Sequence, residues 1–182
     1  MSAEPTADSL AAVGTRAFAD GDYTRAISAF EQAQRAFTSQ GDEIMAARMA
    51  NNLSVALLKS GKAVEALSAA EGTDKVFEAA GDPVLQGMAL GNQAAALADL
   101  KRHDEALDLF RKAAALFKAA NQRDYEATVL QNMSTLQIQM GQRIAALGSM
   151  AQALDVKPHL SLREKFLKRL IRIAVNLMGG KG

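Results

Sequence analysis

The sequence predicts an all-α protein whose helices pack as a row of stacked hairpins. The main observation is a constant step of 40 positions between equivalent residues: Asn52, Asn92 and Asn132; Ala26, Ala66, Ala106 and Ala146; Phe37, Phe77 and Phe117. A fixed period of this length is typical of a stacked-repeat architecture. The composition agrees, because 49% of the residues are hydrophobic, only three are proline, and Ala- and Leu-rich stretches favour helix.

The first period contains two predicted helices. Apolar residues at helical spacing mark the first helix: Leu10, Val13, Ala17 and Phe18. The segment Asp20-Gly21-Asp22 then ends it, since glycine adopts the left-handed conformation at a helix end and aspartate caps the next start. The second helix carries one apolar face: Ala26, Ile27, Phe30, Ala33 and Phe37.

The same signals place the remaining helices. We expect helix pairs at 42–60 with 63–80, 82–100 with 103–120, and 123–140 with 143–156. Lys101 takes the place of a turn glycine, and Asn121 tolerates the left-handed conformation at another turn. Pro158 ends the fourth pair, and a last helix is expected from about Ser161 to Met178. The terminal GGKG should fray.

Small residues explain how the two helices of each pair approach one another. Four facing pairs are predicted: Gly14 with Ala26, Ser54 with Ala66, Ala94 with Ala106, and Ser134 with Ala146. A larger side chain at any of these positions would overpack the contact. One hairpin cannot bury its own apolar face, so the hairpins must stack.

The pattern resembles the tetratricopeptide repeat (TPR). It is carried in the first repeat by Gly14, Ala17, Gly21-Asp22-Tyr23, Ala26 and Phe30, and by matching positions up to Pro158. The resemblance implies a right-handed α-solenoid of four helix-turn-helix repeats at about 7–41, 42–81, 82–121 and 122–158, in a repeat domain of 7–158. Residues 1–6 are expected to be disordered, and 159–182 to form a basic amphipathic capping helix with a frayed tail.

The chain departs from the family pattern in two ways. Its period is 40 residues where the family uses about 34, as in a long-helix variant of the kinesin light chain type. In the second repeat, Ala70 replaces a large aromatic residue, and Gly72-Thr73 falls inside the second helix. We therefore expect that helix to be bent or locally loose. The HEAT repeat has a similar period, but the compact Gly-Asp-Tyr turn and the paired small residues fit the tetratricopeptide pattern better than the HEAT pattern.

The resemblance also implies a concave groove lined by the first helix of each repeat, which binds an extended peptide or protein segment. Asn52, Asn92 and Asn132 occupy equivalent positions there. An amide side chain both donates and accepts, so each can pair with the backbone of an extended peptide. The same helical faces complete the predicted peptide-binding set: Arg48, Val55, Lys59, Asp99, Thr135 and Gln139.

The three asparagines also fit two structural alternatives, since each can bond a neighbouring helix, or all can simply be inherited by duplication. Arg48 and Lys59 suit an acidic group. A full carboxylate clamp of the family type is not expected, because its lysine would precede each asparagine, and Asn51, Gly91 and Gln131 stand there instead.

Charge is divided unevenly along the chain. Residues 1–160 hold 15 basic and 19 acidic residues, whereas residues 161–182 hold six basic and one acidic. The body is thus mildly acidic, which argues against nucleic-acid binding, and the tail is basic. The tail helix at 161–178 is expected to cap the last repeat. Alternatively, it docks on another protein or an anionic membrane surface, or it pairs copies of the chain in a homo-oligomer.

Composition and motifs give no support to catalysis. The chain has no cysteine, and its two histidines, His103 and His159, have no partners at metal-ligand spacing. Phosphate-binding loops and hydrolase or protease motifs do not occur. We therefore expect a cytoplasmic, non-enzymatic protein-interaction module or scaffold, with no metal site and no cofactor.

Overall fold

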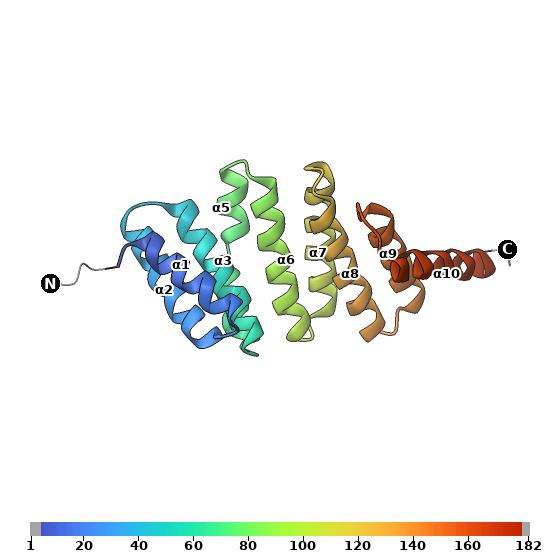
Figure 1. Ribbon diagram of the computed structural model, residues 1–182, viewed down its shortest axis with the longest axis horizontal. Helices are drawn as coiled ribbons and strands as arrows, with labels where there is room; N and C mark the ends of the chain where they lie inside the picture. The colour runs from blue at the N-terminus through green and yellow to red at the C-terminus, as the bar shows by residue number, and fades with distance from the viewer. Residues whose placement is uncertain (1–4, 180–182) are drawn as a thin grey trace.

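The computed structural model describes residues 5–179, with side chains described as far as Ala174, and this part of the chain is helical without any strand. Its ten helices are α1 (Ala7–Ala19), α2 (Tyr23–Ser39), α3 (Glu43–Lys59), α4 (Ala63–Ala70), α5 (Thr73–Ala79), α6 (Pro83–Asp99), α7 (His103–Ala119), α8 (Arg123–Gln139), α9 (Arg143–Val156) and α10 (Leu162–Gly179). They stand side by side in a row, with α1 and α10 at opposite ends of the molecule (Figure 1). The all-α hairpin array is confirmed.

The helices alternate between two roles. The first helices of the four repeats are α1, α3, α6 and α8; each packs against the helix that follows it and, from α3 on, against the one before it. The second helices are α2, α4 with α5, α7 and α9. Helix α1 starts after Thr6, whose hydroxyl accepts a hydrogen bond from the backbone of Ser9. Disorder was expected for residues 1–6 and fraying for 179–182; of these, Thr6 caps α1, Gly179 belongs to α10, and 1–4 and 180–182 lie outside the described residues.

The turns follow the sequence signals. Positive φ angles occur at the expected glycines, including Gly21 and Gly61, and at two residues with side chains, Lys101 (φ 64°) and Asn121 (φ 55°). Both of these substitutes were predicted from the period. Asp22 and Asp42 cap the helices that follow, accepting hydrogen bonds from the backbone of Arg25 (3.0 Å) and Met45 (2.9 Å). Capping of this kind is worth about 1 kcal/mol per helix.

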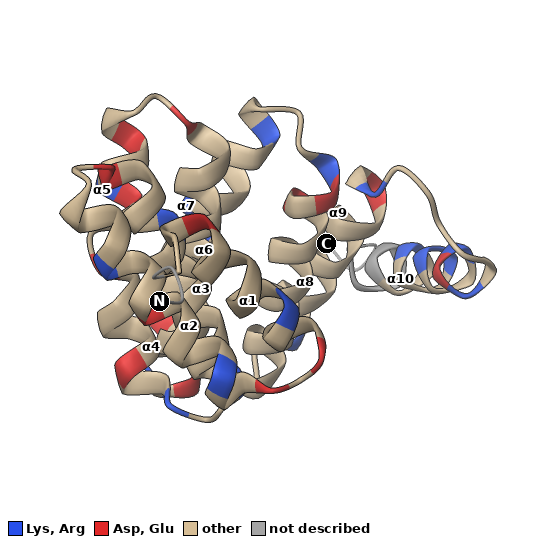
Figure 2. Ribbon diagram, turned by 60° about the vertical axis from the view of Figure 1, so that its left-hand side comes forward, with Lys and Arg blue, Asp and Glu red and all other residues tan. Residues whose placement is uncertain are grey.

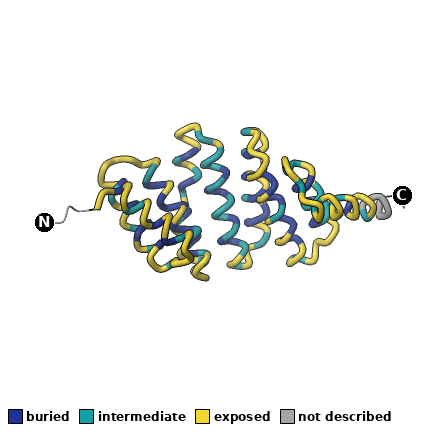
Figure 3. The backbone as a smooth tube through the Cα atoms, viewed as in Figure 1, coloured by how far each residue is buried: buried dark blue, intermediate teal, exposed yellow. Residues whose placement is uncertain are grey.

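The core runs through the middle of the row (Figure 3), and small residues set its spacing. Ser54 and Ser134 are buried, and their hydroxyls donate across the hairpin to the carbonyls of Ala66 (2.7 Å) and Ala146 (2.8 Å). Gly14 leaves room for the ring of Phe30, which would lie 2.6 Å from an added Cβ. Two of the four predicted pairs, Ser54 with Ala66 and Ser134 with Ala146, are therefore in direct contact, and Gly14 packs against Phe30.

The second repeat is interrupted where the sequence indicated. Helix α4 ends at Ala70, Gly72 adopts φ 77°, and α5 begins at Thr73. The Thr73 hydroxyl donates to the Ala70 carbonyl (2.7 Å), and the Gln93 amide from α6 donates to both that carbonyl (3.0 Å) and Asp74 (2.8 Å). The break is thus held by specific hydrogen bonds, and the helix is bent without being loose.

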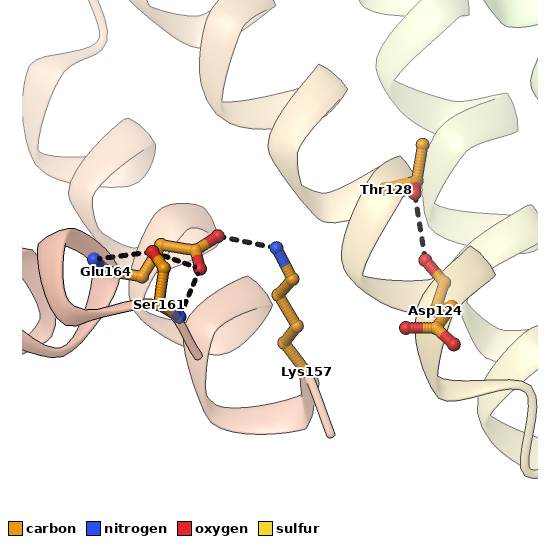
Figure 4. A network of polar contacts seen from close by, with 5 residues as sticks. All are labelled: Asp124, Thr128, Lys157, Ser161 and Glu164. Carbon is orange, nitrogen blue, oxygen red and sulfur yellow. Dashed lines mark hydrogen bonds and ion pairs between the residues drawn. The ribbon is translucent and has the colours of Figure 1, made fainter. Parts of the chain in front are cut away.

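Helix α10 forms as predicted but covers the last repeat only in part. Ile171 is buried, and Lys168 pairs with Asp155 of α9 at 2.6 Å. At its start, Glu164 pairs with Lys157 and accepts hydrogen bonds from the backbone and hydroxyl of Ser161 (Figure 4). The remainder of the helix extends beyond the row of repeats (Figure 1).

The Glu164 contact gives a prediction that can be tested by titration. The Lys157 ammonium and the two Ser161 donors lower the pKa of this carboxyl from 4.5 to about 2. The contact therefore holds α10 to α9 above pH 4.5 and is lost as the pH falls through the folded value. In an NMR titration of the side-chain carboxyl carbon, we expect this low pKa, and Lys157→Met should raise it. An unshifted pKa in the unsubstituted chain would contradict the contact.

Candidate peptide-binding face

Two hollows lie on the face formed by the first helices of the repeats. The first hollow, of about 140 Å³, is enclosed by α1, α2 and α3. Its lining consists of Thr15, Phe18, Phe30, Asn52 and Val55. The rings of Phe18 and Phe30 give it an apolar floor, and the side chain of Asn52 lies at its exposed edge.

The second hollow, of about 210 Å³, lies on the other side of α3 and is lined from α3, α6, α7 and α8. Its apolar lining residues are Leu58, Ala95, Ala98, Phe110 and Leu136. Its polar lining residues are Asp99, Asn132, Thr135 and Gln139, all of them exposed. A hollow with an apolar floor and a polar rim is suited to a ligand that inserts an apolar side chain and keeps its backbone at the rim.

The second hollow also shows that the face curves inward. It is bordered at once by α3, α6 and α8, which belong to three successive repeats. Helices α6 and α8 also touch directly. First helices of separate repeats therefore converge on one space, and a bound segment would contact several repeats together.

The predicted site residues separate into three groups. Asn52 and Val55 line the first hollow, and Asp99, Asn132, Thr135 and Gln139 line the second. Asn92 lies in neither hollow. Arg48 and Lys59 are exposed but border neither hollow, and the Arg48 guanidinium lies 3.6 Å from the sulfur of Met45.

Asn92 has a structural role that the repeat pattern left open as an alternative. Its Nδ2 donates to Oδ1 of Asn51, a residue only 6% exposed, at 3.1 Å. Leaving the buried Asn51 amide without this partner would lower the free energy of unfolding. Asn92 therefore links α6 to α3, whereas Asn52 and Asn132 make no side-chain hydrogen bond to any described residue. The three equivalent asparagines do not form a uniform ladder.

The sequence reasoning missed the aromatic floors. Phe30 and Phe110 are both buried in the core, yet each also borders a hollow. They occupy the same repeat position, which Ala70 fills in the second repeat and Met150 in the fourth. The 40-residue period contains a signal for these floors, because the two hollows occur in the two repeats that carry a large ring at this position.

Two larger hollows on the other side reflect the repeat geometry. They measure about 590 and 600 Å³ and are lined by equivalent positions 80 residues apart, such as Thr38 with Lys118 and Glu43 with Arg123. Each is lined by residues of two successive second helices and of the first helix between them. Within residues 5–179 no group of His, Asp and Glu is arranged to hold a metal ion. No helix of the described chain is long and apolar enough to cross a bilayer.

Comparison with known proteins identifies the repeat. Residues 85–158 match the family model described as tetratricopeptide repeat. The fold is similar to the crystal structure of BtubC (BKLC) from P. vanneervenii, with a TM-score of 0.72 and 16% identity over 93% of this chain and 72% of that one. Curated protein sequences gave no match. The third and fourth hairpins thus match the tetratricopeptide repeat family, and the first two repeat the same hairpin in register at a step of 40 residues.

Proposed function

We propose that the chain is a protein-interaction module that binds an extended peptide or protein segment along the face of its first helices. Tetratricopeptide repeats generally mediate protein–protein interactions, which supports the general role. The observation that carries the finer proposal is the second hollow, where an apolar floor meets exposed Asn132 and Gln139 side chains.

The lining of the second hollow suggests the kind of segment. An apolar side chain of the ligand would insert against Phe110 and Leu136, and burying it supplies about 1.5–3 kcal/mol. The amides of Asn132 and Gln139 would pair with the ligand backbone, at about 0.5–1.5 kcal/mol per hydrogen bond. Asp99 at the rim favours a ligand with a basic residue beside the inserted one.

A panned peptide library tests this proposal. Random peptides displayed on phage are enriched on the full chain, and their affinities are then measured by fluorescence anisotropy. We expect Asn132→Ala to weaken the enriched peptides by about tenfold, the equivalent of one well-formed polar contact. Ala98→Arg, which fills the second hollow, should abolish binding.

Matched controls separate the hollow from other effects. Ala115 is exposed on α7, away from both hollows, so Ala115→Arg should leave affinity unchanged. Asn92→Ala should lower stability by about 1–3 kcal/mol through the unpaired Asn51 amide, and leave affinity within about twofold. Peptides that bind Ala98→Arg and the unsubstituted chain equally would refute the proposal.

A further inference from the structure

The outward side of α10 carries an apolar strip that nothing in the described chain covers. The strip consists of Leu162, Phe166, Leu170 and Ile173, which are 85%, 64%, 46% and 48% exposed. Their spacing of four, four and three residues places them on one face of the helix. Ile171, by contrast, is 5% exposed and turns toward the last repeat. An exposed contiguous apolar strip is characteristic of an interaction site.

The orientation of the strip is fixed by ion pairs on the opposite side of the helix. Glu164 is held by Lys157, and Lys168 is held by Asp155, with its ammonium also 3.4 Å from the carbonyl of Leu154. These contacts attach the inner side of α10 to α9. The strip therefore points away from the repeats on a helix that projects from the end of the row (Figure 1).

Both edges of the strip are basic. Lys165, Arg169 and Arg172 follow one edge at helical spacing, and Arg163 lies on the other, all of them exposed. Figure 2 shows this concentration of Lys and Arg on α10. The one acidic residue of 161–182 is Glu164, which is already paired on the inner side. The outward side of α10 is thus apolar along its centre and cationic at its margins.

We propose that α10 binds the surface of an anionic lipid bilayer, with the strip inserted at the level of the headgroups. A helix with one apolar face and basic flanks lies in the plane of a membrane surface. Each basic side chain near such a surface strengthens binding by about fivefold. The cationic margins match anionic headgroups and oppose a second copy, because pairing two strips would bring like-charged edges together.

Vesicle flotation of the full chain tests the proposal. We expect the chain to float with vesicles of phosphatidylcholine and phosphatidylserine, to remain unbound with phosphatidylcholine alone, and to dissociate as salt is added. Phe166→Glu should weaken binding by about tenfold or more. Arg169→Gln combined with Arg172→Gln should weaken it to a similar degree, and equal helix content by circular dichroism would show that these variants fold.

Val64→Glu is the matched control, since Val64 on α4 is 65% exposed and the substitution adds the same charge. It should leave flotation unchanged. Equal flotation with neutral vesicles, or undiminished flotation of Phe166→Glu, would overturn the proposal. So would a doubled mass in light scattering without lipid that Phe166→Glu returns to a single chain, because the strip would then be covered by a second copy.

Discussion

Replacing Phe77 with alanine is expected to destabilise the chain by about 3–5 kcal/mol. The Phe77 ring is fully buried, and it packs in one cluster with Ala47 of α3 and Ala89 of α6. It is also the main apolar anchor of α5, a helix of only seven residues behind the Gly72 turn. Its two buried neighbours in this cluster are both alanine, whose short side chains cannot move in to fill the cavity.

Denaturation in urea followed by circular dichroism measures this loss as a shift in the midpoint. A repeat array can open one segment at a time, so amide hydrogen exchange in α5 and α6 locates the damage. Phe166→Ala is the control for removing a ring, because that side chain is 64% exposed and its loss should change stability by less than about 0.5 kcal/mol. Equal stability of the two variants would contradict the packing described for α5.

The hairpin array could be predicted from the sequence because its determinants are local. A turn residue, a cap and an apolar stripe act over a few positions, and the period repeats the same signals four times. Even the turns that lack glycine could be predicted, since Lys101 and Asn121 occupy positions where the period requires a positive φ. The break after Ala70 was similarly indicated by Gly72 and a missing aromatic residue.

The candidate site was less predictable because it depends on contacts between repeats. The period marks Asn52, Asn92 and Asn132 as equivalent. It does not reveal that Asn92, unlike the other two, donates a hydrogen bond to Asn51. Nor does it show that Phe110 contributes both to the core and to a hollow. The same limit applies to α10, whose amphipathic pattern fits both a capping helix and a docking helix.

The two proposed surfaces differ in chemistry and lie on different elements. The hollows combine polar rims with small apolar floors, which suits a specific extended segment. The strip on α10 is apolar along its centre and basic at its edges, which suits a lipid surface that is bound through charge and apolar contact without any specific sequence. Because α10 packs against α9 and lines neither hollow, both surfaces can be occupied at once. Such a chain would place a bound segment next to an anionic surface.

Ala106→Leu is expected to destabilise the third hairpin by about 1–3 kcal/mol and to weaken peptide binding with it. Ala106 on α7 and Ala94 on α6 are both fully buried, so added methylene groups must push the two helices apart. Helix α6 supplies Ala95 and Ala98 to the second hollow, and α7 supplies Phe110. A displacement between these helices therefore changes the shape of the hollow, although the substitution replaces none of its lining residues.

Ala115→Leu makes the same chemical change on the exposed side of α7 and should alter neither property. Urea denaturation gives the stability of each variant, and anisotropy with the enriched peptides gives the affinity. If Ala106→Leu loses stability but keeps full affinity, the hollow does not depend on the spacing of α6 and α7. If it binds and unfolds like Ala115→Leu, the close approach of the two helices is not what holds the third hairpin together.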